Sequence, residues 1–306
     1  MGEIEKVTTV YDIAFLGHYT KDTIVSASGT RIVDGGACNY GAHVAVRMGL
    51  GVAAVTRLAK ADAHVVDELA GLGVDVFVRH TPASTCLRLE YPTSNVDERV
   101  IYVTSTAGPF TPAEVESLQT KAVLIGASLR GEVSLDVVKA LAGKDMLVAA
   151  DVQSFVRVVR DGRLVYEAWP EKQAVLAHVD VLKTDAVEAE MLTGQSDVRV
   201  AARVLADLGP SEIVLTHRDG VLVYAGGQFH EAGFFPRELV GRSGRGDTCV
   251  ASYVARRLAA TQGSTIGSPA EATVWAAAVA SLKMEAEGPF RRDIHEIEDL
   301  IRSRYV

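Results

Sequence analysis

The chain has 306 residues, 48% of them hydrophobic, with 31 Lys and Arg against 39 Asp and Glu. A chain of this length and apolar content can bury a full core, which argues against a disordered protein. Its formal net charge of −8 argues against a general nucleic-acid-binding protein, because such a protein needs a cationic surface to neutralise phosphates.

Three cysteines lie far apart, at Cys38, Cys86 and Cys249. This spacing supports neither a disulfide framework nor a cysteine zinc site, and it fits a reducing compartment. No apolar run reaches the ~18 residues that span a bilayer. The segment MGEIEKVTTVYDIAFLG lacks the features of a secretory signal. We therefore expect a cytoplasmic protein that binds neither nucleic acid nor a membrane.

Apolar runs typical of strands alternate with helical patterns along the chain. The expected strands are 13–17, 52–57, 74–78, 122–125, 146–150, 179–182 and 212–216. The expected helices include 61–72, 112–118, 135–142 and 198–208. Thr111 and Ser268 each begin a capping-box pattern with proline at the first helical position. Alternating strands and helices predict a three-layer α/β/α sandwich around a mostly parallel sheet.

Two segments, at about 23–34 and 85–104, alternate polar and apolar residues and contain turn residues. They predict hairpins inserted within a single α/β domain that covers residues 1–306. We expect them to form a small β-sheet that projects from the main domain and covers a site or forms a dimer contact. Ordinary surface hairpins are the alternative interpretation.

The most informative segment is VGRSGRGDTCVASYVARRL, residues 240–258. A glycine-rich turn, 241–246, runs directly into a helical pattern from Asp247 to about residue 260. Glycines let the backbone turn tightly, and the helix N-terminus adds unpaired donors and a partial positive charge. This combination suits a bound phosphate. Asp247 is then either the N-cap of the helix or a general base for an attacking alcohol.

This segment resembles the C-terminal motif of the ribokinase-like (PfkB) family of carbohydrate kinases, D-T-x-G-A-G-D. The resemblance places Gly244, Arg245 and Gly246 in the anion hole and makes Asp247 the catalytic base. The chain departs from the motif in two places: Arg245 replaces alanine, and Gly241-Arg242 replaces Asp-Thr. The Arg245 side chain could reach a phosphate or point to solvent.

Further segments resemble the family's acceptor-binding motifs in the same order along the chain. The run that begins at Gly35 and Gly36 resembles the N-terminal glycine motif, which contacts the substrate and opens a helix. Tyr40 takes the position of the usual asparagine, and Asn39 lies one place early. The segment GHYTKD at 17–22 resembles the end of the family's first strand, and within it Asp22 matches a carboxylate that binds substrate hydroxyls. The resemblance also implies a β lid over the sugar site and allows a homodimer through that lid.

The donor side is matched by two segments. The run from Lys183 to Glu188 resembles the family's Asn-x-x-Glu motif, with Asp185 in place of asparagine. By this resemblance Glu188 and Asp185 bind Mg²⁺, mainly through water. The alternative is an acidic first turn favoured by the helix dipole. Thr216 to Gly220 resembles the nucleotide-side loop, so Lys183, Thr216 and Gly220 are expected to contact ATP.

Asp151, Gln153 and Arg157 follow the strand expected at 146–150, where an open α/β sheet places its ligand crevice. Their donors and acceptors suit several hydroxyls, although a solvated loop is the alternative. Together with Tyr40 and the Gly-Pro-Phe at 288–290, they resemble the inositol-kinase branch of the family.

The resemblance therefore implies phosphorylation of a hydroxyl on a small polyol or sugar, with ATP and Mg²⁺ as cofactors. Myo-inositol or a related cyclitol is the favoured acceptor, and ribose, fructose or a nucleoside stays open. A non-catalytic sugar or nucleotide sensor on the same fold is a separate alternative. A dinucleotide-dependent dehydrogenase is disfavoured, because HYTK at 18–21 stands where a glycine fingerprint would follow the first strand.

Overall fold

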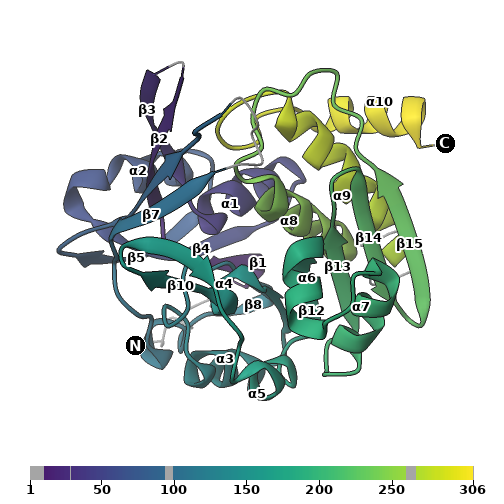
Figure 1. Cartoon of the computed structure of the whole chain (residues 1–306), viewed down its shortest axis with the longest axis horizontal. Coiled ribbons are helices and arrows are strands. Elements are labelled where there is room, and N and C mark those ends of the chain that lie inside the picture. The colour runs from purple at the N-terminus through teal and green to yellow at the C-terminus, as the bar shows by residue number, and fades with distance from the viewer. Residues whose placement is uncertain (1–9, 28, 94–98, 260–266, 306) are drawn as a thin grey trace, which may run out of the picture.

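A large twisted sheet crosses the centre of the molecule, with helices on both of its faces (Figure 1). The computed structural model describes residues 10–27, 29–93, 99–259 and 267–305. The nine strands run in the order β15-β14-β13-β12-β9-β8-β1-β4-β5. They are β1 (Tyr11–Leu16), β4 (Val52–Ala59), β5 (Asp75–Thr81), β8 (Thr120–Ile125), β9 (Leu147–Asp151), β12 (Val181–Asp185), β13 (Glu212–Thr216), β14 (Gly220–Ala225) and β15 (Gln228–Gly233). From β13 to β5 every neighbouring pair is parallel, whereas β14 and β15 turn back as antiparallel strands.

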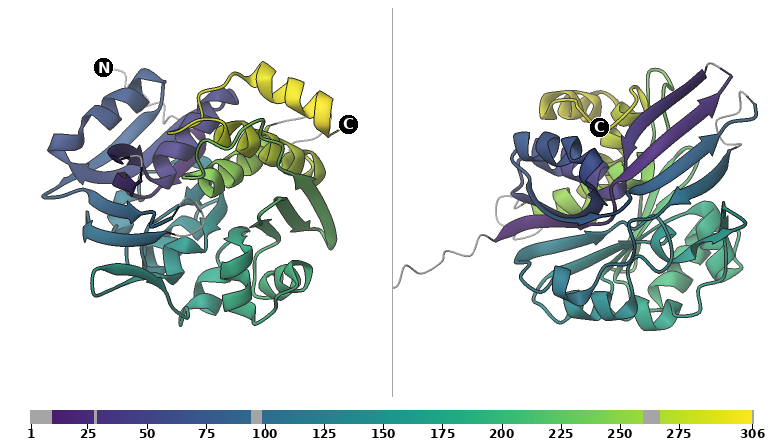
Figure 2. Two further views of the ribbon diagram at one scale, coloured as in Figure 1. Left: turned by 45° about the horizontal axis from the view of Figure 1, so that its top comes forward. Right: turned by 90° about the vertical axis from the view of Figure 1, so that its left-hand side faces the viewer.

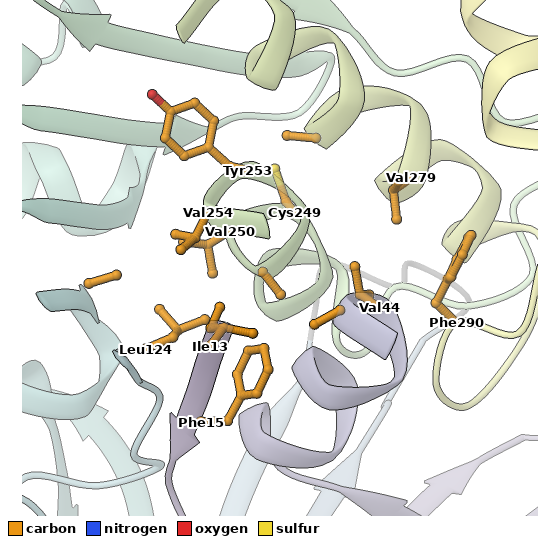
Figure 3. Close-up of a cluster of buried hydrophobic side chains, with 14 of the residues drawn as sticks. Ile13, Phe15, Val44, Leu124, Cys249, Val250, Tyr253, Val254, Val279 and Phe290 are labelled. Atoms are coloured by element: carbon orange, nitrogen blue, oxygen red, sulfur yellow. The ribbon is translucent and has the colours of Figure 1, made fainter. Parts of the chain in front are cut away.

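Helices cover the two faces of this sheet in separate layers. One layer contains α1 (Ala37–Arg47), α2 (His64–Gly71), α8 (Arg245–Leu258), α9 (Pro269–Met284) and α10 (Ile294–Arg304). The other contains α3 (Leu135–Ala142), α4 (Gln153–Val156), α5 (Lys172–Leu176), α6 (Ala186–Thr193) and α7 (Val198–Ala206). Successive residues of a strand point to opposite faces, so Ile13 and Phe15 of β1 pack in the first layer and Ala14 and Leu16 in the second. Figure 3 shows the first of these cores, in which α1 and α8 pack against β1. The three-layer α/β/α sandwich is confirmed.

A second sheet of six strands, which we call the lid, projects beyond the main sheet (Figure 2, right). Its order is β10-β11-β7-β6-β2-β3. The strands are β2 (Thr20–Ser26), β3 (Gly29–Gly35), β6 (Thr85–Glu90), β7 (Val100–Ser105), β10 (Arg157–Arg160) and β11 (Arg163–Tyr166). Both expected hairpins are present as antiparallel pairs, although residues 28 and 94–98 of their turns lie outside the described residues.

The lid differs from the sequence prediction in two respects. Asp22 lies within lid strand β2 and not at the end of the first main-sheet strand. Residues 157–166 form a third hairpin, which the sequence analysis did not predict and which joins the lid through β11 and β7. Arg130 fixes this hairpin, because its guanidinium donates to the carbonyl oxygens of Phe155, Glu167 and Ala168.

The helix expected at 112–118 is wrong, because only a 3₁₀ turn, η2 (Pro112–Glu114), forms there behind the Thr111 capping box. The Lys144 ammonium donates to the carbonyl oxygens of Val115, Glu116 and Leu118, so this side chain takes up carbonyls of the segment after the turn. At α9, Ser268 accepts a hydrogen bond from the Glu271 amide, but the Glu271 carboxylate accepts from Arg256, so only half of the expected capping box forms among the described residues. Among the described residues, no helix is both long and apolar enough to cross a membrane.

Candidate active site

The predicted site residues gather at the carboxyl ends of the central parallel strands, beneath the lid. A cavity of about 470 Å³ lies there. The predicted residues that line it are Asp22, Gly36, Tyr40, Gln153, Arg157, Lys183, Asp185, Thr216, Gly244, Arg245, Gly246 and Asp247. The carboxyl edge of an open α/β sheet is the usual position of a ligand crevice, so the sheet order brings these distant segments together.

Helix α8 begins at this cavity without a capping side chain. Its N-cap is Gly244, whose φ of 75° is the left-handed conformation that favours glycine. A Cβ atom on Gly244 would lie 2.4 Å from the Tyr40 ring, so only glycine fits there. The amide of Arg245 donates to the Arg242 carbonyl, which leaves the Gly246 and Asp247 amides at the open helix end. This end of α8 is suited to an anion.

The structure changes two of the predictions made for this turn. Asp247 is the third residue of α8 and not its N-cap, so the capping interpretation is wrong. The Arg245 guanidinium lies over the Phe234 ring, 5.4 Å from its centroid. Arg245 therefore packs against an aromatic side chain at the cavity wall, and its amide is engaged within the turn.

The Asp247 carboxyl faces the cavity with a perturbed proton affinity. Burial, with repulsion from Asp151, raises its pKa to about 6, while Lys183 and Arg157 act in the opposite direction. Gln153 Nε2 donates to Asp247 Oδ1 at 3.4 Å. A carboxylate with a pKa near the working pH is suited to act as a general base.

Beside Asp247 lies a buried ion pair between neighbouring strands β9 and β12. Lys183 Nζ lies 3.1 Å from Asp151 Oδ2 and 4.0 Å from Glu188 Oε2. Asp151 is 1% exposed, accepts from the Gln153 amide and does not line the cavity. The structure therefore makes Asp151 a counter-ion of Lys183, which corrects its predicted contact with substrate. Buried charges are tolerated when they are paired in this way.

The start of α6 is a reciprocal capping box. Asp185 Oδ1 accepts from the Glu188 amide at 2.8 Å, and Glu188 Oε2 accepts from the Asp185 amide at 3.0 Å. The acidic first turn is thus real, as the alternative interpretation stated. Burial raises the pKa of Glu188 to about 7. Its other oxygen, Oε1, is buried and has no hydrogen-bond partner among the described residues.

These two carboxylates fit a water-mediated magnesium site. Asp185 lines the cavity, whereas Glu188 is 1% exposed and does not; the Glu188 Oε1 atom has no hydrogen-bond donor among the described residues. Mg²⁺ keeps several of its waters and is held by few carboxylates, so a bound water can supply that donor. Within the described ranges, no group of three or more His, Cys, Asp or Glu side chains could ligate a metal directly.

On the donor side, Thr216 lines the cavity and Gly220 does not. A Cβ atom on Gly220 would lie 2.4 Å from the Ala232 carbonyl oxygen, so this glycine permits the close pairing of β14 and β15. The structure thus corrects the predicted contact between Gly220 and the phosphoryl donor. The neighbouring His217 and Arg218 line the cavity instead.

On the acceptor side, Asp22 projects from β2 and is 9% exposed. Burial raises its pKa to about 6, and Arg99 acts in the opposite direction. Gly35 does not line the cavity, because it lies behind this carboxylate: a Cβ there would be 2.6 Å from Asp22 Oδ2. Gly36, with a φ of 97°, is the N-cap of α1, and a Cβ there would be 2.3 Å from the His18 carbonyl oxygen.

The lid contributes residues that the sequence analysis did not single out. Leu87 and Leu89 of β6 and Ile101 of β7 line the cavity, together with Arg99. Asp22 pairs with Leu87, and Leu89 pairs with Ile101, so a carboxylate and an apolar surface lie side by side. The alternation in 85–90 places Leu87 and Leu89 on one face of the strand and was the available signal.

Comparison with known proteins agrees with this geometry. A family model described as pfkB family carbohydrate kinase matches residues 7–292. A cytidine kinase of Thermococcus kodakarensis is 26% identical over 251 residues, which are 80% of this chain and 87% of that protein. A sulfate complex of a pyrophosphate-dependent kinase in the ribokinase family superposes with a TM-score of 0.85 at 35% identity, over 94% of this chain and 99% of the other. A pyrophosphate-dependent kinase in that family, complexed with a pyrophosphate analog and myo-inositol, superposes with the same TM-score at 34% identity and the same coverage. The chain is therefore a member of the pfkB family of carbohydrate kinases.

Proposed function

We propose that this kinase transfers a phosphoryl group to a hydroxyl of myo-inositol or a related cyclitol. The carrying observation is the Asp247 carboxyl, which lies at the open N-terminus of α8 in the same cavity as the Asp22 carboxyl. Asp22 is placed to accept hydrogen bonds from hydroxyls, and Leu87 and Leu89 offer an apolar surface to the C–H face of a ring. The myo-inositol complex of a protein 34% identical to this chain supports the choice of acceptor.

In the proposed reaction Asp247 accepts the proton of one acceptor hydroxyl as its oxygen attacks phosphorus. The bond between phosphorus and the bridging oxygen of the donor breaks, and the remaining phosphate leaves with the electron pair. The Gly246 and Asp247 amides stabilise the charge on the transferring group. Lys183 adds positive charge beside Gly246, since a Cβ on that glycine would lie 3.0 Å from its Nζ. When bound, Mg²⁺ neutralises donor charge, and Asp185 and Glu188 would hold it through water.

Pyrophosphate is the donor that we propose. The family resemblance implies ATP, but the two similar structures are described as pyrophosphate-dependent kinases. The cavity wall is rich in cations, which suit a small and highly charged donor. Besides Arg99 near Asp22, they are Arg157, Lys183, Arg218, Arg242 and Arg245. ATP is the second candidate donor, and a pyrimidine nucleoside is the second candidate acceptor because of the cytidine kinase relative.

A product assay tests this function. Wild-type enzyme with Mg²⁺ and either pyrophosphate or ATP would be incubated with myo-inositol, ribose, fructose or cytidine, and phosphate esters would be quantified by mass spectrometry. We expect ester formation from myo-inositol and pyrophosphate, reduced at least ~10²-fold in Asp247→Asn. Asp197→Asn, at a distant helix cap, is the matched control. An Asp247→Asn variant with wild-type turnover would refute the assignment of the base, and turnover with ATP alone would refute the assignment of the donor.

A further inference from the structure

A second cavity, of about 390 Å³, adjoins the proposed active site, and the reaction described above does not use it. It lies between the β2–β3 hairpin of the lid and the segment that leads into α8. Tyr40, Arg242 and Ser243 line both cavities, so these residues form the partition between them. Tyr40 contributes the largest buried side chain of this partition, because it is 3% exposed.

The Tyr40 ring is held from two sides. Toward the active site it contacts Gly244, where any Cβ atom would lie 2.4 Å from the ring. The Lys283 ammonium also lies over the ring, 5.8 Å from its centroid. Lys283 is 2% exposed, and its Nζ donates to the Ala286 carbonyl oxygen at 3.2 Å. A ring fixed in this way acts as a rigid wall and not as a mobile gate.

The second cavity has a chemical character of its own. Ile24, Val33, Val240 and the aromatic Tyr91 supply apolar walls, and the Arg31–Glu287 ion pair and Ser26 supply polar ones. Lys283 also lines it and retains donors beyond the one given to Ala286, since an ammonium has three. Apolar walls, an aromatic ring and a polar donor suit a planar heterocycle with carbonyl groups at its edge. A pyrimidine base has this chemistry, and a cyclitol does not.

We propose that Tyr40 determines specificity by confining the acceptor to a single ring. A nucleoside whose sugar occupies the first cavity would need the second cavity for its base, and the Tyr40 ring blocks that path. This inference rests on the proposed function, because it assumes that the acceptor binds beside Asp22 and Asp247. It deepens that function by naming the residue that separates cyclitol from nucleoside substrates.

The test compares Tyr40→Asn, which removes the ring, with Tyr40→Phe, which keeps it. The Tyr40 hydroxyl has no hydrogen-bond partner among the described residues, so phenylalanine preserves the wall. For each protein, kcat/KM is measured with cytidine and with myo-inositol. We expect Tyr40→Asn to raise the ratio of cytidine to myo-inositol at least ~10-fold, the scale of one stacked base, and Tyr40→Phe to exclude cytidine as wild type does. If Tyr40→Asn does not fold, Tyr40→Leu takes its place.

Cytidine binding, followed by thermal shift without any donor, separates this inference from the proposed function. The proposed role of Tyr40 is supported if cytidine stabilises the variant without the ring but stabilises neither wild type nor Tyr40→Phe. This result would count even if no cyclitol is phosphorylated. Wild-type binding or turnover of cytidine overturns the wall. A folded variant without the ring whose cytidine ratio and cytidine binding match wild type also overturns it. Failure of wild type to phosphorylate any cyclitol refutes the proposed acceptor alone.

Discussion

The proton affinity of Asp247 is decided by its immediate neighbours. Burial and Asp151 raise its pKa, while Lys183 and Arg157 lower it, and the balance leaves the value at about 6. The base is therefore ionised at neutral pH yet is close enough to that range to take a proton from an alcohol. Lys183 contributes to this balance even though it pairs most closely with Asp151.

Replacing Lys183 with Met should move the acidic limb of the kcat/KM profile to higher pH by about one unit. The base must be ionised, so activity rises as the pH passes its pKa, and loss of a nearby positive charge raises that pKa. The full pH profile is the measurement, because a merely structural loss would lower activity without moving the limb. Lys121→Met, at an exposed ion pair, is the control. A limb that stays near pH 6 would show that Asp247 does not set it.

The helices differ in how their N-termini are capped. Helices α3, α7 and α9 begin with a serine or aspartate whose side chain accepts a first-turn amide, and α6 and α10 begin with capping boxes. Helices α1 and α8 begin at glycines with positive φ and have no side-chain cap. Gly36 and Gly244 both line the active-site cavity. Helices α2, α4 and α5 also begin without a side-chain cap, so α1 and α8 are set apart by their glycine N-caps with positive φ at the cavity, where free amides can bind a ligand.

A capped helix away from the site should affect stability alone. Asp197 Oδ1 accepts from the Arg199 amide at 2.8 Å and the Val200 amide at 3.1 Å, at the start of α7. Asp197→Ala should lower the free energy of unfolding by about 1 kcal/mol, within the usual 0.5–2 kcal/mol for lost caps. Urea denaturation measures the change, and kcat should stay at the wild-type value. Asp197→Asn, which keeps an acceptor, should lose less; equal losses would contradict the capping role.

At the scale of the whole molecule, the active site concentrates buried carboxylates. Burial raises the pKa of Asp22, Asp247 and Glu188, so each is costly to keep ionised in the folded protein. When these three carboxyl groups are protonated, the folded state holds their protons more tightly than the unfolded chain does. Their contribution to stability is therefore favourable at low pH and is lost as the pH rises through the folded pKa. The buried carboxylates of the active site therefore lower the stability of the folded protein at neutral pH.

Asp247→Asn should consequently be more stable than wild type at pH 7.5, by on the order of 2 kcal/mol, because it removes a buried charge. The difference should shrink as the pH falls from about 6 toward 4, where wild-type Asp247 takes up its proton. Thermal unfolding of the two proteins across this range is the measurement. Burial lowers the pKa of His43 to about 4, so this residue also titrates in the range. Because both proteins contain His43, its contribution cancels when their stabilities are subtracted. A variant less stable than wild type at pH 7.5 would contradict the argument.

The order of elements, the glycine turn and the capping residues could be predicted from the sequence, because each depends on contacts within a few residues. The resemblance to the family placed Asp247, Gly244 and Asp22 in one site, and the structure brings them to one cavity. At 112–118, where a helix was expected, only a 3₁₀ turn forms, and a distant side chain, Lys144, donates to carbonyls of the segment that follows it. The β10–β11 hairpin was missed although the sequence carries a local signal for it: Asp161-Gly162 forms its two-residue turn, with φ of 49° and 76°.

The tertiary structure alone decided which side chains face the cavity. Sheet order places Lys183 beside Asp151, so this carboxylate became an internal counter-ion, although its position after a strand predicted a substrate contact. Strand pairing likewise made Gly220 a packing glycine. Tyr40 meets Gly244 only because α1 packs against α8. Local patterns specify elements and their ends, whereas long-range packing selects the partners of each side chain, and catalysis and specificity depend on those partners.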